Sequence, residues 1–346
     1  MSSLSRLTRL INARQRTLLV GPPGCGKTAL VLAAAAACGH KVVLFRTSLA
    51  ERVDLAGCYV PDLASGITRA LPLALLAELR NTNVPTILFL DDLGQAPTDV
   101  QAACMTLFDD GSISPEVLIW GATNRPGDKS GVTALCEPLR SRFHVAFAIA
   151  TPTTESTPSG PTYLSTWAAA VEGWLDWASG EDFDSAIIAW HRSTSGRTLY
   201  AWRPAADPAA RFPDFRSWAT VGRLFAAGIT DLDTVSAAIG RGTAAEFLAF
   251  AALADQLPTP QQVWMDPDGA ALPTEPAAQY LIATMLGRAC EPKFAGAFIR
   301  YISRLPRVQG AFAARDAFRR VGARLAGNKE WQTWFLANQE LFAVAV

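Results

Sequence analysis

The sequence lacks an excess of charge of either sign: 31 lysines and arginines balance 31 aspartates and glutamates in 346 residues. A general electrostatic attraction to nucleic acid or to anionic lipid is therefore not indicated, although a local basic patch stays open. Histidine is also scarce, and its three residues show no metal-ligand spacing. We interpret these histidines as structural residues.

Paired cysteines and long apolar runs are missing as well. The six cysteines are scattered, with no CxxC pattern for a redox or zinc site, so we interpret them as small apolar side chains in a reducing compartment. The N-terminus has no signal-peptide pattern. The longest apolar run, residues 29–38, has about half the length of a membrane span. We therefore predict a cytoplasmic protein with no membrane span.

What the sequence does contain is an alternation of strand-like and helix-like segments over residues 1–150. Strands are predicted at 17–22, 41–47, 86–92, 116–124 and 143–150, and helices at 27–38, 70–80, 97–108 and 132–140. The strand-like runs are continuously apolar, as is typical of strands buried on both faces. The predicted fold class is α/β, a parallel sheet with helices on both faces.

Two proline-rich breaks divide the rest of the chain. The break at 151–162 ends the α/β domain of residues 1–150, and the break at 257–276 separates a helical domain, 161–256, from a C-terminal helical region, 257–346. Nine of the ten tryptophans follow the first break. Their helical spacing favours packing in a helical core over the alternative, a platform on which a ligand stacks.

A phosphate-binding loop is predicted between the first strand and the first helix of the sheet. "GPPGCGKT" fits the pattern GxxxxGK[ST], with a strand before it and a helix after it. Backbone amides of such a loop surround a polyphosphate, the lysine neutralises it, and the hydroxyl faces magnesium. The predicted ATP-binding residues are Gly21, Pro22, Pro23, Gly24, Cys25, Gly26, Lys27, Thr28 and Ala29, with Thr28 also a magnesium ligand.

Two adjacent acids, Asp91 and Asp92, follow the apolar run "ILFL". A phosphate loop needs a second magnesium-directed acid at the end of a neighbouring strand, and Asp91 has that position. The alternative is a solvated turn, which would not need the apolar residues before it. We predict that Asp91 is a magnesium ligand.

Three further segments extend the pattern: "IWGATNRPGD", "EPLRSRFHV" and "ARFPDFRSWATVGRLF". With them the sequence resembles an AAA+ ATPase, and within that class the MoxR branch. The resemblance covers residues 1–150 and reaches to about residue 230. It implies a P-loop NTPase sheet followed by an α-helical lid, with ATP and Mg²⁺ as cofactors.

The resemblance also implies a role for each polar residue near the γ-phosphate. Asp91 would hold magnesium through water, and Asp92 would orient or deprotonate the attacking water. Asn124 would be the first sensor, a side-chain amide near the γ-phosphate. Relatives usually have glutamate where this chain has Asp92, which is about 1.5 Å shorter in reach. We therefore predict slow hydrolysis.

Three arginines would complete the site. Arg142 would be the arginine finger, which reaches the nucleotide of a neighbouring subunit. Arg140 would be a second finger or a structural partner. Arg216 would be the second sensor on the lid, although "DFR" stands where relatives often have proline before the arginine. A finger in trans couples hydrolysis to assembly, because no single subunit then has a complete site.

Two hairpins are implied by the same resemblance. Residues 51–72 would contain a hairpin inserted in the second helix. In relatives this hairpin often faces the pore of the ring. Tyr59 and Arg69 would make pore contacts there, with a surface hairpin as the alternative. Residues 109–117 would form a second hairpin before the first sensor.

The leading functional hypothesis is a ring-forming, chaperone-like ATPase that remodels or activates a partner protein. The predicted assembly is a homo-oligomer, a hexamer. The resemblance implies a partner with a von Willebrand factor A domain. The alternatives are a nucleic-acid-directed AAA+ motor and a nucleotide-binding assembly switch with little hydrolysis. Zero net charge and the lack of a recognisable nucleic-acid-binding motif disfavour the motor. The guanine-reading [NT]KxD pattern is missing, which disfavours GTP.

Overall fold

The computed structural model describes residues 2–128, 131, 134–154, 160–202 and 210–343. The chain divides into two compact units. The first consists of Met1–Ala170 and Trp202–Ala206, and the second of Val171–Ala201 and Asp207–Val346. We describe each unit by itself. Within the described part of the chain, no helix has the length and hydrophobicity to cross a membrane.

A five-stranded parallel sheet forms the centre of the first unit, in the order β2-β5-β6-β1-β7. The strands are β1 (Thr17–Val20), β2 (Lys41–Arg46), β5 (Thr86–Asp91), β6 (Val117–Thr123) and β7 (Val145–Ala148). All five predicted strands are confirmed. Every residue of β6 is buried, as is expected for an apolar strand that is covered on both faces. The predicted α/β class is therefore correct.

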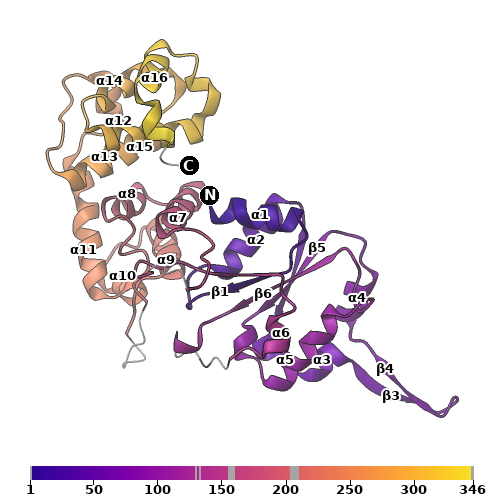
Figure 1. Cartoon of the computed structure of the whole chain (residues 1–346). Helices are drawn as coiled ribbons and strands as arrows, with labels where there is room; N and C mark the ends of the chain where they lie inside the picture. Colours follow the sequence, from indigo (N-terminus) through magenta and orange to yellow (C-terminus); the bar gives the residue numbers. More distant parts are fainter. Residues whose placement is uncertain (1, 129–130, 132–133, 155–159, 203–209, 344–346) are drawn as a thin grey trace. The chain divides into compact units, whose positions relative to one another are not determined.

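Helices cover both faces of this sheet (Figure 1). The α-helices are α1 (Ser3–Asn12), α2 (Lys27–Ala37), α3 (Arg52–Ala56), α4 (Ala74–Asn81), α5 (Thr98–Cys104) and α6 (Glu137–Arg140). Four 3₁₀ turns complete the unit: η1 (Thr47–Leu49), η2 (Leu93–Gln95), η3 (Met105–Phe108) and η4 (Pro126–Asp128). Helices α1 and α2 pack against each other, while α3, α4 and α5 join the core on the other face, where Leu55, Leu79 and Val100 meet Leu88 and Leu90 of β5.

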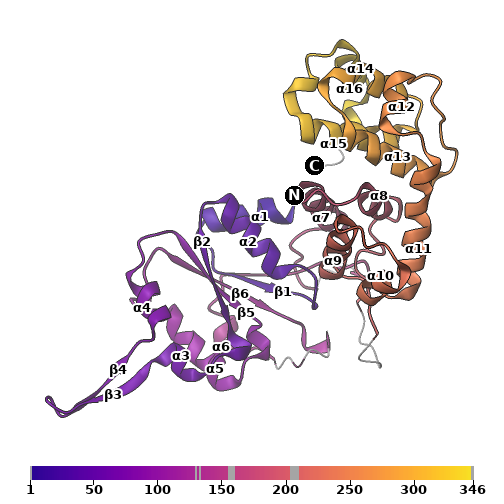
Figure 2. The same ribbon diagram turned by 180° about the vertical axis from the view of Figure 1, so that it is seen from behind.

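An antiparallel hairpin stands between α3 and α4. It consists of β3 (Cys58–Asp62) and β4 (Ile67–Leu71), and the predicted hairpin in this region is confirmed. In both Figure 1 and Figure 2 the hairpin extends away from the sheet. Its apolar side chains face solvent: Tyr59 is 73% exposed and Leu63 is 91% exposed.

The second predicted hairpin, at 109–117, is wrong. No strand lies between residues 109 and 116, and β6 begins only at Val117. The polar groups of the segment bond elsewhere: the Ser112 amide donates to the Asp109 carbonyl in a turn. The Ser114 amide donates to the Leu79 carbonyl, and its hydroxyl to the Thr82 carbonyl. The segment therefore caps α4 instead of pairing with a second strand.

Two predicted helices are shorter than expected, and proline explains both. The helix predicted at 70–80 begins at Ala74, because β4 continues to Leu71 and Pro72 follows it. The helix predicted at 132–140 begins at Glu137, with Pro138 in its first turn, where proline is favoured. Residues 132–133 lie outside the described residues.

The second unit is helical. Its α-helices are α7 (Trp167–Gly180, shared with the first unit), α8 (Ser185–Ser193), α9 (Phe215–Ala226), α10 (Leu232–Ile239), α11 (Arg241–Ala251), α12 (Pro260–Met265), α13 (Pro276–Ala289), α14 (Ala295–Ile302), α15 (Arg307–Val321) and α16 (Lys329–Ala343). The 3₁₀ turns are η5 (Ala252–Gln256), η6 (Pro292–Phe294) and η7 (Gly322–Leu325). The predicted helical domain, 161–256, and the predicted C-terminal helical region, 257–346, both contribute helices to this unit. The boundary between these two predicted domains, at residue 256, stays a prediction.

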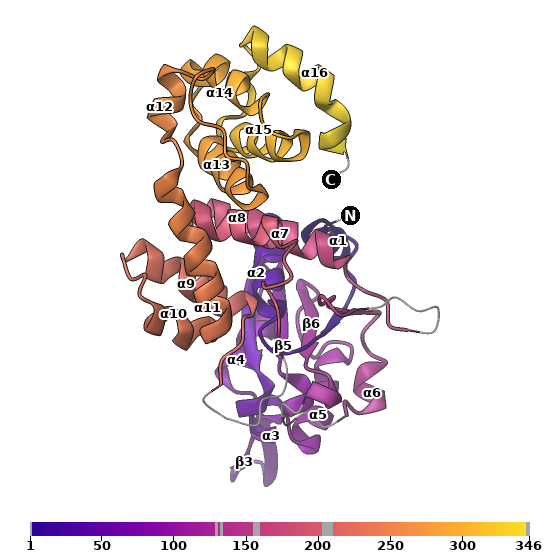
Figure 3. The same cartoon turned by 90° about the vertical axis from the view of Figure 1, so that its left-hand side faces the viewer.

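Most tryptophans of this unit pack in its core, as predicted. Trp218 and Trp331 are almost fully buried, and Trp174 is buried against the His191 ring. Trp177 is more exposed, but its ring lies 6.0 Å from that of Trp174 on the same face of α7. Figure 3 shows the helices of the second unit, with α13 and α15 next to each other.

Candidate nucleotide-binding site

The predicted phosphate loop connects β1 to α2 at the carboxyl edge of the sheet, where ligands of open α/β sheets bind. Gly26 caps the N-terminus of α2 with φ of 83° and ψ of 16°. Residues with a β-carbon rarely adopt this left-handed conformation, so the position requires glycine. No side chain caps the first turn of α2. Its backbone amides are therefore available to an anion such as a phosphate.

Lys27 is buried in the loop and is held by three oxygen acceptors. Its Nζ donates to the carbonyls of Gly21 at 2.8 Å and Pro22 at 3.1 Å, and to Oδ1 of Asn124 at 2.7 Å. These contacts place the ammonium group beside the loop without a phosphate. Burial raises the pKa of the neighbouring Cys25 thiol, so this side chain stays neutral beside Lys27.

Asp91 and Thr28 meet as the magnesium prediction requires. Thr28 Oγ1 donates to Asp91 Oδ2 at 2.9 Å. The Asp92 amide donates to Asp91 Oδ1 at 3.1 Å, and the Thr47 hydroxyl donates to the Asp91 carbonyl at 2.8 Å. A hydroxyl and a carboxylate are hard oxygen ligands of the kind that Mg²⁺ prefers. The residues present fit a magnesium ion that takes its other ligands from water and phosphate.

No group of three or more His, Cys, Asp or Glu residues that could hold a metal occurs among the described residues. A magnesium ion that depends on bound phosphate agrees with this, because Mg²⁺ in nucleotide sites takes only one or two protein ligands and keeps several waters.

Asp92 has a left-handed backbone, with φ of 58° and ψ of 34°, and it caps η2. Its carbonyl accepts from the Gln95 amide at 2.8 Å, which closes the turn. Aspartate and asparagine tolerate this conformation better than other residues with a side chain. The turn therefore provides a physical reason for aspartate, where the resemblance leads one to expect glutamate.

Asn124 lies at the end of β6 and is buried against Lys27. The turn that follows is held by Asp128, which is 4% exposed. Asp128 accepts from the Arg125 amide at 2.9 Å and from Nη2 of the same residue at 2.9 Å. This pair fixes the chain directly after Asn124.

Sequence reasoning missed two supports of the site, the Thr47 hydroxyl and the Arg125–Asp128 pair. Both had a signal: Thr47 directly follows β2 at the same edge of the sheet as Asp91, and opposite charges three residues apart can meet in a turn. Neither sequence pattern identifies the group that the side chain contacts. Only the fold shows that group.

Arg140 is the last residue of α6 and Arg142 follows it by two residues, and the polar contacts of both side chains are local. Arg140 Nη2 pairs with Glu137 Oε2 at 2.7 Å, and Arg142 Nη1 donates to the Pro138 carbonyl at 2.8 Å. The structure thus brings Lys27, Thr28, Asp91 and Asn124 together by hydrogen bonds but forms no such bond from these arginines to the phosphate loop.

Arg216 is exposed in the first turn of α9, in the second unit. Asp214 caps this helix in a reciprocal pair with Ser217. The position agrees with the expected start of a helix, and the sensor role of Arg216 stays a prediction.

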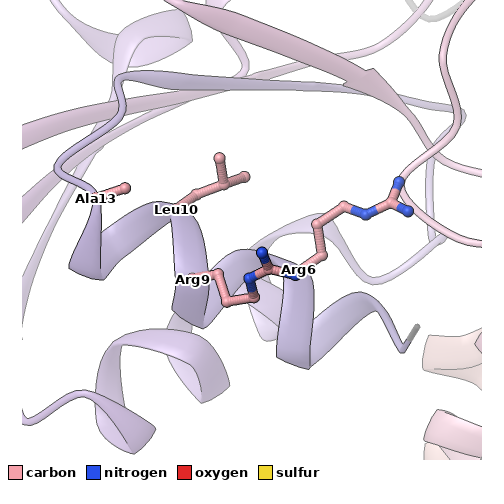
Figure 4. Close-up of a pocket in the computed structure, with 4 residues that line it drawn as sticks. All are labelled: Arg6, Arg9, Leu10 and Ala13. Carbon is pink, nitrogen blue, oxygen red and sulfur yellow. The ribbon is translucent and has the colours of Figure 1, made fainter.

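A shallow cavity of about 340 Å³ lies along α1 and is lined by Arg6, Arg9, Leu10 and Ala13 (Figure 4). Arg6 extends from the helix and donates to the Tyr163 carbonyl at 2.9 Å. The lining residues belong to α1 and to its C-cap, Ala13, and none belongs to the phosphate loop. The cavity is therefore separate from the hydrogen-bonded site.

Comparison with known proteins shows what the chain resembles. Residues 17–151 match the family described as "ATPase family associated with various cellular activities (AAA)". An outer mitochondrial transmembrane helix translocase of Xenopus tropicalis is 29% identical over 151 residues, 40% of this chain and 38% of the relative. A mitochondrial sorting homolog of Caenorhabditis elegans is 31% identical over 150 residues, 40% of each. The chain thus spans about two fifths of the length of these curated relatives.

Among solved structures, the RuvB Holliday junction branch migration motor of Thermotoga maritima aligns with a TM-score of 0.41 and 18% identity, over 71% of this chain and 67% of that one. The family match includes the phosphate loop, Asp91 and Asn124, which the structure joins by hydrogen bonds. Residues 17–151 of this chain are therefore similar to the AAA ATPase family.

Proposed function

We propose that the protein is a MoxR-like, ring-forming ATPase that hydrolyses ATP to remodel or activate a partner protein. One observation supports this proposal above the others: the Lys27–Asn124 and Thr28–Asp91 hydrogen bonds join three motifs that lie far apart in the sequence. Each of these pairs would exchange its partner for a phosphate oxygen or a metal when ATP binds.

The residues of the chain would then act by position and charge. Lys27 would leave Asn124 for the β- and γ-phosphates, and the Asn124 amide would face the γ-phosphate. Thr28 and Asp91 would hold Mg²⁺, which neutralises charge that develops on the phosphates. Asp92, fixed at the end of β5 by its turn, orients the attacking water and accepts its proton.

The position of Arg142 supports assembly. Its guanidinium group donates to the Pro138 carbonyl of α6 and makes no hydrogen bond to the phosphate loop of its own chain among the described residues. We infer that Arg142 reaches the nucleotide of a neighbouring subunit, as a trans-acting finger does. A homo-hexameric ring provides such a neighbour for every subunit.

Partner contact is assigned to the β3–β4 hairpin. An isolated two-stranded hairpin is marginally stable in water, and this one exposes Tyr59 and Leu63. A surface of this kind is expected to be covered in the working assembly. We assign Tyr59 and Arg69 to contacts in the pore of the ring, and a protein with a von Willebrand factor A domain as the partner.

The test is ATP hydrolysis measured against protein concentration, with the Lys27→Ala variant as the blank. Specific activity that rises with concentration and then saturates supports a site shared between subunits. Activity that stays constant on dilution contradicts the shared site. Strong stimulation by single-stranded or duplex DNA would instead favour the nucleic-acid motor, and assembly on ATP without turnover would favour the switch.

A further inference from the structure

A second polar cavity, of about 510 Å³, lies wholly in the second unit. It is bounded by α7, α13 and α15 (Figure 3) and by the turn that follows α7. Its size is in the range of small-molecule sites, about 300–1,000 Å³. Three of its lining side chains are the arginines Arg288, Arg319 and Arg320. Three guanidinium groups at one cavity form a concentration of positive charge in a chain with no net charge.

Arg288 is held at the cavity wall. Its side chain is 9% exposed. Nη1 donates to Ser179 Oγ at 3.1 Å and Nη2 to Asp182 Oδ1 at 2.8 Å. Desolvation lowers the pKa of this guanidinium group, the charge of Asp182 raises it, and the charge of Arg320 lowers it. Arg288 and Arg320 are therefore like charges close together that share one carboxylate, Asp182.

The carboxylates at the cavity do not balance these arginines. Arg320 Nη1 lies 3.6 Å from Asp182 Oδ1, the oxygen that already accepts from Arg288. Arg319 pairs with Asp176. Two carboxylates thus serve three guanidinium groups.

The third carboxylate at the cavity, Asp316, is already neutralised. Both of its oxygens accept from Arg192, at 2.5 and 2.7 Å, and both side chains are buried. If Asp316 is counted against Arg192, the carboxylates of Asp176 and Asp182 remain for three guanidinium groups. Arg319 and Arg320 have exposed side chains, at 43% and 53%.

We propose that this cavity binds a small anionic molecule through a carboxylate or phosphate group held by Arg288, Arg319 and Arg320. Guanidinium groups present paired donors that match the two oxygens of either anion. A bound anion would give Arg320 an acceptor of its own and would offset its repulsion of Arg288. The site is independent of the nucleotide site, because all its residues belong to the helical unit.

The test uses the full-length Lys27→Ala variant, which removes phosphate binding at the nucleotide site. Thermal unfolding and titration calorimetry are followed with inorganic phosphate in one arm and succinate in the other. Sodium chloride at matched ionic strength is the blank. We expect saturable binding in at least one arm, and the stronger arm identifies the ligand as a phosphate or a carboxylate.

The variants Arg320→Gln and Arg319→Gln, each added to Lys27→Ala, should weaken that binding at least tenfold. Arg300→Gln is the matched control, because Arg300 is an exposed arginine of the same unit that pairs with Asp268 away from the cavity. The control should bind like the parent. Lack of saturable binding in both arms overturns the proposal, and so does binding that survives both cavity substitutions.

Discussion

Thr28 Oγ1 lies 2.9 Å from Asp91 Oδ2, and this hydrogen bond joins the first turn of α2 to the end of β5. A hydroxyl and a carboxylate held together at a phosphate loop would supply at most two of the six oxygen ligands of an octahedral Mg²⁺ ion. Thr28 and Asp91 both belong to the first unit, so this contact involves that unit alone.

The Thr28→Ala variant removes the hydroxyl and leaves Asp91 in place. We expect hydrolysis to fall on the order of 100-fold or more, because the metal that positions the phosphates loses a ligand. The affinity of this variant for nucleotide in the absence of magnesium should change little. Thr333→Ala, at an exposed threonine of α16, is the control and should keep full activity. Equal hydrolysis in both variants would remove Thr28 from the metal site.

Asp92→Asn tests the water-activating acid. Asparagine is similar in size and also tolerates the left-handed backbone, so the turn should persist. We expect ATP binding and assembly to be unchanged and hydrolysis to fall about 10²–10⁴-fold, the usual contribution of a general base. Single-turnover hydrolysis and size-exclusion chromatography in ATP measure the two properties. Hydrolysis at the wild-type rate would contradict the assignment.

Asp92→Glu separates the effect of side-chain length on hydrolysis from the effect of the left-handed backbone on stability. Glutamate reaches further toward the γ-phosphate, so hydrolysis should be equal or higher. It tolerates the left-handed conformation less well, at a cost of up to about 1 kcal/mol. The melting temperature should therefore fall by about 2–4 °C. Complete loss of activity would show that the site is built around the short side chain.

Gly121, in the middle of β6, allows two flanking segments of the site to pack. A β-carbon there would lie 2.6 Å from Leu93 Cδ1 and 2.8 Å from Phe143 Cζ. Leu93 follows Asp92, and Phe143 follows Arg142. Gly121→Ala should therefore displace both neighbours and cost about 1–3 kcal/mol of stability.

Hydrolysis by Gly121→Ala should fall as well, because Leu93 and Phe143 position the residues beside them. Gly127→Ala is the control, since a β-carbon at Gly127 meets no atom within 4 Å. Chemical denaturation and steady-state hydrolysis are measured for both. Normal stability and activity in Gly121→Ala would show that the strand shifts to accommodate the methyl group.

His191 makes the second unit sensitive to acid. Burial lowers its pKa to about 3, and the rings of Trp174 and Trp218 lie against it. The unfolded chain binds this proton near pH 6.5, so it takes up more protons than the folded chain at acid pH. The stabilisation is complete above about pH 6.5 and is lost as the pH falls toward 3. At pH 5 the loss is about 2 kcal/mol.

His191→Phe should flatten this dependence in urea titrations at pH 7 and pH 5. The control His144→Phe, at an exposed histidine, should keep the wild-type dependence. The comparison is the change in unfolding free energy between the two pH values, so a constant packing cost of the phenylalanine cancels. An unchanged pH dependence in His191→Phe would show that other groups cause it.

The sequence was sufficient for the parts that local patterns determine. Continuous apolar runs predicted all five strands. The runs of β1, β5 and β6 belong to buried strands, whereas β2 and β7 lie at the edges of the sheet and are less buried. The phosphate loop followed from its glycines, lysine and threonine between a strand and a helix. The resemblance to a known family supplied the β3–β4 hairpin, which no local pattern predicts as an exposed element.

What failed depends on contacts that are distant in the sequence. Residues 109–116 bond to the end of α4 in place of pairing as strands, and only the fold brings Leu79 within reach. Leu93, which follows the left-handed turn at Asp92, likewise packs beside Gly121 of β6. The same limit applies to Thr47, whose acceptor on Asp91 is 44 residues away.

The central claim is an ATPase site that two subunits share, and mixing two inactive variants tests it most directly. Asp92→Asn lacks the acid, and Arg142→Ala lacks the finger, so each should be nearly inactive alone. If Arg142 acts in a neighbouring subunit, mixed rings contain interfaces with an intact Asp92 and an intact Arg142. We predict that hydrolysis recovers on mixing to a substantial fraction of the wild-type rate. Mixtures that stay as inactive as the separate variants, while wild type is active and the subunits exchange, would contradict the shared site.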